Sequence, residues 1–240
     1  EPGVCLDANS LYPTAMAIGI FPVGKFDVLN EGDIDVRDLE QRLARGEMLV
    51  AEVTLDAGNI RYPLIPWKNE KGNLVYKAGV FTDIYYSPDL VEAVALGYKI
   101  VDVKRCVRWA RSERIFADTI ETLYNDRMEN TKKAKQLNQE GKKNEASGCE
   151  SMAKTIKILL NSMYGKFLEN IKTVSKFGEL DPTKRLIRSM TLPNGQIEST
   201  YRLNKITDRK PLYLGGFILA YARQIMNRLI ISVGPENIAY

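Results

Sequence analysis

The stretch CLDANSLYPTAM, residues 5–16, constrains the interpretation of this 240-residue chain more than any other. An apolar run ends at Asp7, and a Tyr-Pro pair, Tyr12 and Pro13, interrupts what otherwise reads as the start of a helix. We therefore expect a buried strand over VCLDA and a short helix or turn over SLYPTAMAIGI. Taken alone, an Asp in this position is more often a capping residue than a metal ligand.

The composition excludes several classes of protein. Hydrophobic residues make up 45% of the chain, which supports a sizeable core, and no apolar run reaches the roughly 18 residues of a membrane-spanning helix. The sequence contains no His, which rules out Ser-His-Asp triads, Cys-His dyads and His-ligated zinc. A net charge of +4 fits an anionic partner, and we expect no membrane contact. Because the chain begins without Met, we expect it to be a piece of a longer protein.

Short strands and helices alternate in the first half of the chain. The patterns predict an amphipathic helix closed by Gly46, a loop-rich segment over 61–79, and a helix over 87–98 with Ser87 as its N-cap. Strands are expected over EMLVAEVTL, VFTDIYYS and KIVDVKRCVRW.

Longer helices dominate the second half. We expect helices over 112–139 and 149–164, joined by the polar turn EGKKNEASG into an antiparallel hairpin. The Asn194-Gly195 pair predicts a β-hairpin, a helix is expected over 216–233, and ENIAY reads as a strand being entered. This mixture predicts an α+β fold.

The helix containing AKTIKILLNSMYGKF, residues 153–167, carries a polar stripe. At 100° per residue, Lys157, Asn161 and Tyr164 lie on one face, and Gly165 stands where a helix C-cap is expected. A neighbouring apolar stripe can pack on the body of the protein: Ile156, Leu160 and Met163. An ammonium, an amide and a ring in this order suit a nucleotide, although such residues on a helix are usually solvated or capping.

The two motifs together resemble those of a known family. DANSLYP is similar to motif A of family B DNA polymerases, Asp-x-x-Ser-Leu-Tyr-Pro, and KILLNSMYG is similar to their motif B, Lys-x-x-x-Asn-Ser-x-Tyr-Gly. Their order and separation also match. FPVG after motif A and NSMYGKF in motif B resemble the protein-primed subfamily of phages with linear genomes and of linear plasmids.

The resemblance implies a polymerase palm, with an antiparallel sheet and helices, joined to a helical-hairpin fingers subdomain and inserted β-rich segments. The implied parts are a palm with motif A over 1–66, an insertion of the terminal-protein-region 1 type over 67–110, fingers with motif B over 111–165, an insertion of the terminal-protein-region 2 type over 166–210, and a palm helix and strand over 211–240.

The resemblance assigns the catalytic and metal-binding roles to motif A. Asp7 would be a catalytic carboxylate and, with the backbone carbonyl of Ala8, a ligand of two Mg²⁺ ions, with Mn²⁺ as an alternative. Tyr12 would lie under the sugar of the incoming nucleotide and exclude a ribose 2′-hydroxyl. Ser10 and Leu11 would also line the nucleotide site, although alternation points Leu11 inward.

The remaining site residues come from the predicted hairpin. By resemblance, Lys157 and Arg127 would contact the triphosphate, and Asn161 and Tyr164 would line the pocket of the nascent base pair. DNA contacts are implied for Ser162, Gly165 and Lys166. The nearby cluster of Lys132, Lys133 and Lys135 is equally well explained as a solvated helix face.

One departure from the family pattern limits these expectations. The third family motif, Tyr-x-Asp-Thr-Asp, is absent, and the sequence stops at Tyr240 before its aspartates. We therefore expect a fragment of a DNA-directed DNA polymerase that lacks the second catalytic Asp and is inactive alone.

The implied partners are primer-template DNA, deoxynucleoside triphosphates and a terminal priming protein. The implied location is the cytoplasm of an infected bacterium for a phage protein, or a mitochondrion for a linear plasmid. Two other functions stay open. In the first, the chain is a non-catalytic nucleic-acid-binding module whose basic hairpin binds backbone phosphates. In the second, the chain is a module that docks a priming protein.

Overall fold

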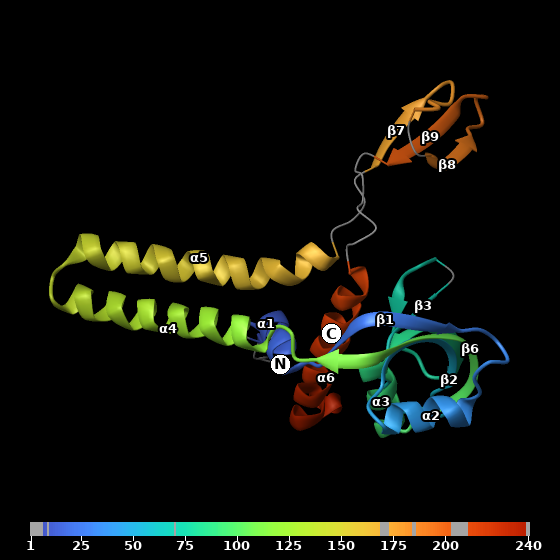
Figure 1. The fold of residues 1–240 in the computed structure, drawn as a ribbon, viewed down its shortest axis with the longest axis horizontal. Coiled ribbons are helices and arrows are strands. Elements are labelled where there is room, and N and C mark those ends of the chain that lie inside the picture. Colours follow the sequence, from blue (N-terminus) through green and yellow to red (C-terminus); the bar gives the residue numbers. More distant parts are fainter. Residues whose placement is uncertain are drawn as a thin grey trace.

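A four-stranded antiparallel sheet forms the body of the protein, with the strand order β1-β6-β2-β5 (Figure 1). The computed structural model describes residues 7–8, 10–69, 71–168, 173–183, 186–202 and 211–238. The strands of the sheet are β1 (Phe21–Leu29), β2 (Met48–Asp56), β5 (Val80–Tyr86) and β6 (Lys99–Glu113). The mixture of helices with an antiparallel sheet confirms the α+β prediction.

One face of this sheet packs on two short helices, α2 (Val36–Ala44) and α3 (Ser87–Ala95). Alternation along β2 places Leu49, Val53 and Leu55 in the core between them, each fully buried. Asp35 is the N-cap of helix α2, and its carboxylate accepts a 2.7 Å hydrogen bond from the Asp38 amide. This core gives the body a rigid sheet from which the other parts project.

A second core joins helix α6 (Leu212–Val233) to α1 (Leu11–Ile18) and to the base of the long hairpin. Two glycines let α6 approach closely: an added Cβ on Gly216 would collide with the Tyr86 ring, and one on Gly215 would meet the Leu168 side chain. Arg223 of α6 donates two hydrogen bonds to the buried Asp89 carboxylate, at 2.8 and 2.6 Å. Helix α6 therefore ties α1 to the sheet.

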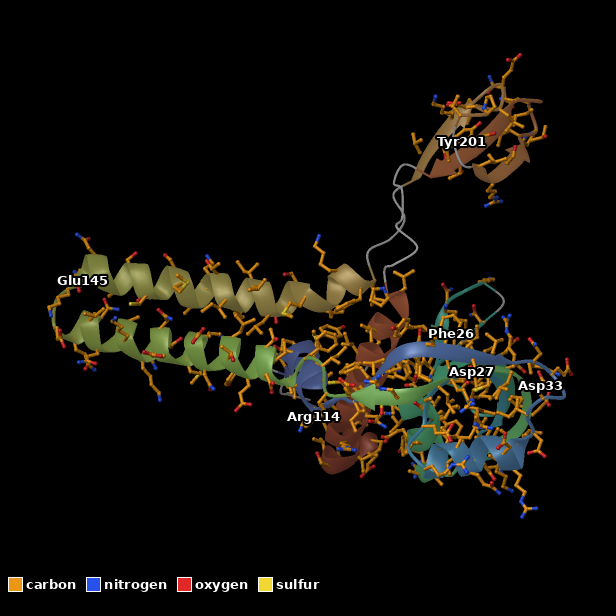
Figure 2. All side chains as sticks on the ribbon, viewed as in Figure 1. Phe26, Asp27, Asp33, Arg114, Glu145 and Tyr201 are labelled. Atoms are coloured by element: carbon orange, nitrogen blue, oxygen red, sulfur yellow. The ribbon has the colours of Figure 1, made fainter. Side chains whose placement is uncertain are left out.

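The long hairpin consists of α4 (Ala117–Gln139) and α5 (Lys143–Phe167), which pack side by side (Figure 1). Figure 2 shows Glu145 at its tip and Arg114 at its base. The predicted hairpin is confirmed, and its first helix ends at Gln139 as predicted, but the predicted starts of both helices were wrong. The first helix starts at 117 instead of 112, because β6 pairs with β1 as far as Glu113 opposite Phe21. The second helix starts at 143, so the connecting turn is shorter than expected.

A separate three-stranded sheet has the order β7-β9-β8, from β7 (Thr173–Phe177), β8 (Leu186–Thr191) and β9 (Ile197–Arg202). The predicted turn at Asn194-Gly195 joins β8 to β9, with Gly195 at φ 81°. Tyr201 is fully buried in this sheet. A two-stranded ladder, β3 (Trp67–Lys68) with β4 (Leu74–Val75), lies in the segment predicted to be loop-rich.

Several other predictions need correction. Ser87 is not the N-cap of α3 but its first residue, and its hydroxyl accepts a 3.3 Å hydrogen bond from the Leu49 amide. Helix α6 starts at Leu212, four residues before the predicted start. In ENIAY, Glu236 and Asn237 belong to a 3₁₀ turn, η1 (Pro235–Asn237), instead of a strand. The strand expected over VCLDA lies largely outside the described residues. No helix in the described part of the chain is long and apolar enough to cross a membrane.

Candidate functional site

Tyr12 and Tyr164, which come from the two sequence motifs, stack face to face. Their ring centroids are 3.8 Å apart and their planes differ by 18°. Tyr12 lies on the second residue of α1, and Tyr164 lies on the last turn of α5. Burial, together with the neighbouring Tyr164 hydroxyl, raises the pKa of Tyr12 above its ordinary value. The structure thus brings the two motifs into direct contact.

The turn before α1 contains an unusual backbone conformation. Ser10 has φ 55° and ψ 41°, and no other non-glycine residue of the described ranges has a positive φ. A left-handed conformation at a residue with a Cβ costs on the order of 1–3 kcal/mol, and such strained residues cluster at functional sites. Here it turns the chain directly from the Asp7 segment into the helix that carries Tyr12. Leu11 is half-buried and packs against the second core, as alternation predicted.

Lys157 and Asn161 are exposed on the same face of α5 as Tyr164. Lys157 lies seven residues before Tyr164, or about 10 Å along the helix axis at 1.5 Å per residue. Arg127 is half-buried on α4. Within the part of the chain that the structure describes, no carboxylate forms an ion pair with Lys157 or Arg127. These two cations therefore remain available for an anionic ligand.

Three residues proposed to contact DNA follow Asn161 on α5: Ser162, Gly165 and Lys166. Gly165 was expected to cap the helix, but α5 continues through it to Phe167, so that prediction was wrong. Phe167 extends the helix because its ring packs against Phe116, at a centroid distance of 5.5 Å. A Cβ built on Gly165 would meet no described atom within 4 Å. Ser162 and Lys166 are exposed, and the Ser162 hydroxyl donates to the Leu159 carbonyl at 3.0 Å.

The predicted metal ligands provide the right kind of donor but an incomplete set. Asp7 is exposed and Ala8 is half-buried, and the carboxylate and carbonyl oxygens are hard donors that suit Mg²⁺. In the described ranges, no group of three or more His, Cys, Asp or Glu side chains gathers into a possible metal site. Asp7 and Ala8 therefore fit part of a divalent metal site.

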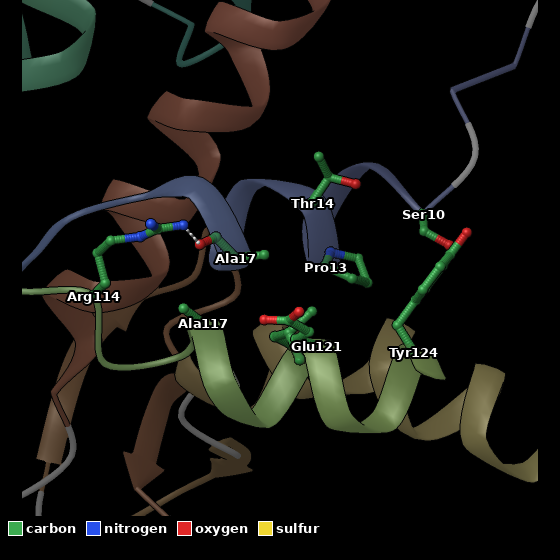
Figure 3. A pocket seen from close by; sticks show the side chains of 9 residues that line it. Ser10, Pro13, Thr14, Ala17, Arg114, Ala117, Glu121 and Tyr124 are labelled. Atoms are coloured by element: carbon green, nitrogen blue, oxygen red, sulfur yellow. Dashed lines mark hydrogen bonds between the residues drawn. The ribbon is translucent and has the colours of Figure 1, made fainter. Parts of the chain in front are cut away.

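A cavity that the sequence did not predict lies between α1 and α4. The cavity has a volume of about 320 Å³. In Figure 3 the side chains of Ser10 and Tyr124 point toward each other at one end of it. At the other end Arg114 donates a 2.8 Å hydrogen bond to the Ala17 carbonyl, at the end of α1. No sequence motif marks Arg114 or Tyr124, because both become neighbours of α1 only when the hairpin folds against it.

Comparison with known proteins agrees with the resemblance found in the motifs. A family model described as DNA polymerase type B, organellar and viral, matches residues 1–177. No curated protein sequence matches the chain.

Solved structures of one polymerase are similar in fold. The chain has 19% identity and a TM-score of 0.54 to phi29 DNA polymerase complexed with primer-template DNA, a post-translocation binary complex, over 93% of this chain and 34% of that chain. For phi29 DNA polymerase complexed with single-stranded DNA, the identity is 19% and the TM-score is 0.50, over 90% of this chain and 32% of that chain. The chain thus spans about a third of the length of these structures.

Proposed function

Because the chain belongs to the family of type B DNA polymerases, organellar and viral, we propose that it carries part of a site for template-directed DNA synthesis. The reaction transfers a nucleotidyl group from a deoxynucleoside triphosphate to a primer hydroxyl. The observation that carries this proposal is the stack of Tyr12 on Tyr164, which joins motif A to motif B. In these roles Tyr12 lies under the sugar and Tyr164, with Asn161, borders the nascent base pair.

The stacked rings also indicate how the site responds to its substrate. With the ring centroids only 3.8 Å apart, no sugar or base fits between the two rings. A bound nucleotide would therefore separate Tyr164 from Tyr12. Since Tyr164 lies on the hairpin and Tyr12 on α1, this separation moves the base of the hairpin relative to the turn that holds Asp7.

Phosphate recognition would come from the cations of the hairpin. From Ser151 to Phe167, α5 contains Lys154, Lys157 and Lys166 and no acidic residue. Lys157 and Arg127 are the side chains proposed to hold the triphosphate. Ser162, Gly165 and Lys166 are proposed to contact DNA. Glycine within a helix costs about 0.5–1 kcal/mol relative to Ala, and an approaching DNA backbone gives a reason for it at Gly165, where the chain itself offers none.

Asp7, with the Ala8 carbonyl, would hold a divalent cation, for which we propose Mg²⁺ with Mn²⁺ as an alternative. Bound there, the cation would neutralise charge that develops on the reacting phosphate. One carboxylate cannot offset two divalent ions, because each unit-charge pair at 4 Å is worth about 4 kcal/mol even at an effective dielectric of 20. We therefore propose that the 240-residue chain does not extend primers by itself.

The division of the chain follows from the same proposal. The palm, with motif A, corresponds to 1–66 and 211–240, the fingers to 111–165, and two inserted regions to 67–110 and 166–210. Strands from 1–66 and 67–110 share the four-stranded sheet, which supports a first insertion that is built onto the proposed palm. Initiation from a terminal protein is proposed from the motif resemblance to the protein-primed subfamily.

Primer extension tests this function, in the longer polymerase of which we propose this chain to be a part. Tyr12→Val should raise ribonucleotide incorporation at least tenfold relative to deoxynucleotide incorporation, because the ring no longer meets the 2′-hydroxyl. Asp7→Asn should reduce both by several orders of magnitude. Tyr76→Val is the matched control, because it makes the same substitution at a tyrosine that is 57% exposed and lies between β4 and β5, outside the proposed site. An unchanged sugar preference in a folded Tyr12→Val protein contradicts the role given to Tyr12.

A further inference from the structure

The cavity between α1 and α4 has walls of two kinds (Figure 3). Pro13 and Ala17 of α1 and Ala117 and Ile120 of α4 form an apolar surface. At 100° per residue, Pro13 and Ala17 lie about 100° and 140° around α1 from Tyr12, so this surface faces away from the Tyr12 ring. A flat apolar group can therefore enter without touching the stacked tyrosines.

Polar and aromatic groups surround that apolar surface. Tyr124, which is 41% exposed, offers a ring face, and Glu121 and Arg114 offer an acceptor and donors. Arg114 uses one of its five N–H donors on the Ala17 carbonyl, which fixes the guanidinium at the cavity and leaves further donors. Among the described residues Glu121 forms no ion pair, so its carboxylate can accept hydrogen bonds from a ligand.

We propose that this cavity is a binding site for a nucleobase, with guanine preferred. A base has a flat apolar face for the alanines, Pro13 and the Tyr124 ring, and base–aromatic stacking does not depend on the sequence. Guanine also offers N–H donors to the Glu121 carboxylate and the O6 and N7 acceptors to Arg114. Thymine offers fewer donors to an acceptor-only carboxylate and binds more weakly.

The place of the cavity links it to the proposed polymerase site. Ser10 forms part of its wall and also makes the left-handed turn after Asp7. A base bound against α1 would therefore stabilise the left-handed turn at Ser10. This inference rests on the proposed function, because that function requires nucleotides to be present. The residues proposed to hold the triphosphate do not take part in it. The base would come from a free nucleotide or from an unpaired stretch of DNA.

The test uses phosphate-free ligands, so that the proposed phosphate contacts of Lys157 and Arg127 do not contribute. Binding of 2′-deoxyguanosine and of thymidine to the 240-residue chain is measured by ligand-observed saturation-transfer NMR and by titration. The chain should bind deoxyguanosine more tightly than thymidine. Tyr124→Ala and Glu121→Ala should each weaken deoxyguanosine binding about tenfold, whereas Tyr124→Phe, which keeps the ring, should retain most of it.

Matched controls separate this site from the rest of the hairpin. Met128→Ala changes a residue one turn further along α4 with almost the same exposure, 40%, outside the cavity, and it should leave deoxyguanosine binding unchanged. Lys157→Ala should also leave it unchanged. To identify the source of the base, single-stranded hexamers of thymidine are compared with hexamers that contain one guanine. If the hexamer with guanine binds more tightly and Glu121→Ala abolishes the difference, the base comes from DNA. If the two hexamers bind equally, the base comes from a free nucleotide.

Absence of deoxyguanosine binding, or equal binding by the parent and by folded Tyr124→Ala and Glu121→Ala variants, overturns the proposal. Folding of each variant is checked by its thermal melt. Failure of this site and failure of the proposed function are distinguishable. Loss of triphosphate binding in Lys157→Ala supports the polymerase site even when no nucleoside enters the cavity.

Discussion

Helices α5 and α6 are similar in length, at 25 and 22 residues, but they differ in how much of their surface is buried by the rest of the molecule. Helix α6 is buried along its first half, from Leu214 to Ala222, and ends its buried face at Asn227. Helix α5 buries only Ala146, Ile156 and Leu160, and its last half presents lysines to solvent. Because α6 is largely buried and α5 is largely exposed, we expect α6 to determine the stability of the protein and α5 to determine ligand binding. Substitutions in the two helices should separate these properties.

The largest expected effect is a loss of unfolding free energy from a substitution in α6. Arg223→Met leaves the Asp89 carboxylate, which is only 2% exposed, without its bidentate partner. Breaking a buried ion pair in this way costs about 3–5 kcal/mol of unfolding free energy. Urea unfolding followed by the fluorescence of the two tryptophans, Trp67 and Trp109, measures this loss in the body of the protein.

A double substitution controls for the charge. In Asp89→Leu with Arg223→Met, no unpaired charge remains, so part of the lost stability should return. If the single variant Arg223→Met unfolds at the same urea concentration as the parent, α6 is not fixed to α3 by this pair.

Two helical glycines provide the next comparison. Gly216→Ala forces a methyl group against the Tyr86 ring and should cost about 1–3 kcal/mol of stability, as overpacked cores do. Gly165→Ala meets no described atom and should raise stability by about 0.5–1 kcal/mol, because Ala is the better helix former. At the same time Gly165→Ala should weaken binding of primer-template DNA. Thermal melts and DNA titration of both variants measure these effects, and unchanged DNA binding by Gly165→Ala would remove that residue from the interface.

The sequence predicted the features that depend on local periodicity. The hairpin, the amphipathic α2 and the stripe of Lys157, Asn161 and Tyr164 follow from residue spacing along one helix. The resemblance to family motifs assigned Tyr12 and Tyr164 to one nucleotide site, but neither the resemblance nor the spacing predicted that their rings stack on each other. The roles of these side chains in catalysis and binding stay predictions.

The features that the sequence did not predict depend on partners far away in the chain. The start of α4 was misplaced because residues 112–113 look helical but pair with β1. Gly165 looked like a helix end, but the contact of Phe167 with Phe116 carries the helix past it. The ion pair of Asp89 with Arg223 joins residues that are 134 positions apart, and no local pattern marks either of them. The α1–α4 cavity was missed for the same reason.

On α5, a smaller effect should appear in binding without any change in stability. Lys157→Ala removes an exposed cation that has no ion-pair partner among the described residues. Affinity of the 240-residue chain for a deoxynucleoside triphosphate should fall about tenfold, which corresponds to about 1.4 kcal/mol. Lys133→Ala is the control, because Lys133 is an exposed lysine in the second half of α4, which leads to the hairpin turn. Equal losses in both variants would mean that the hairpin attracts triphosphates only through its overall charge.

The smallest expected effect lies outside both helices, in the β7-β9-β8 sheet, and it depends on pH. Hydrogen bonds from the Thr183 hydroxyl and amide lower the pKa of the Asp181 carboxyl from 3.8 to about 2, and Lys176 contributes from 3.4 Å. Because the folded pKa is below the unfolded one, this carboxylate stabilises the sheet above pH 3.8, and the contribution is lost as the pH falls toward 2. Amide exchange of the sheet should therefore accelerate in that window, and an NMR titration should give Asp181 a pKa of about 2. Thr183→Val removes the hydroxyl and should raise this pKa, while the urea unfolding of the body, followed by its tryptophans, should stay as in the parent. An Asp181 that titrates at its ordinary value in the parent would show that the Thr183 contacts do not persist in solution.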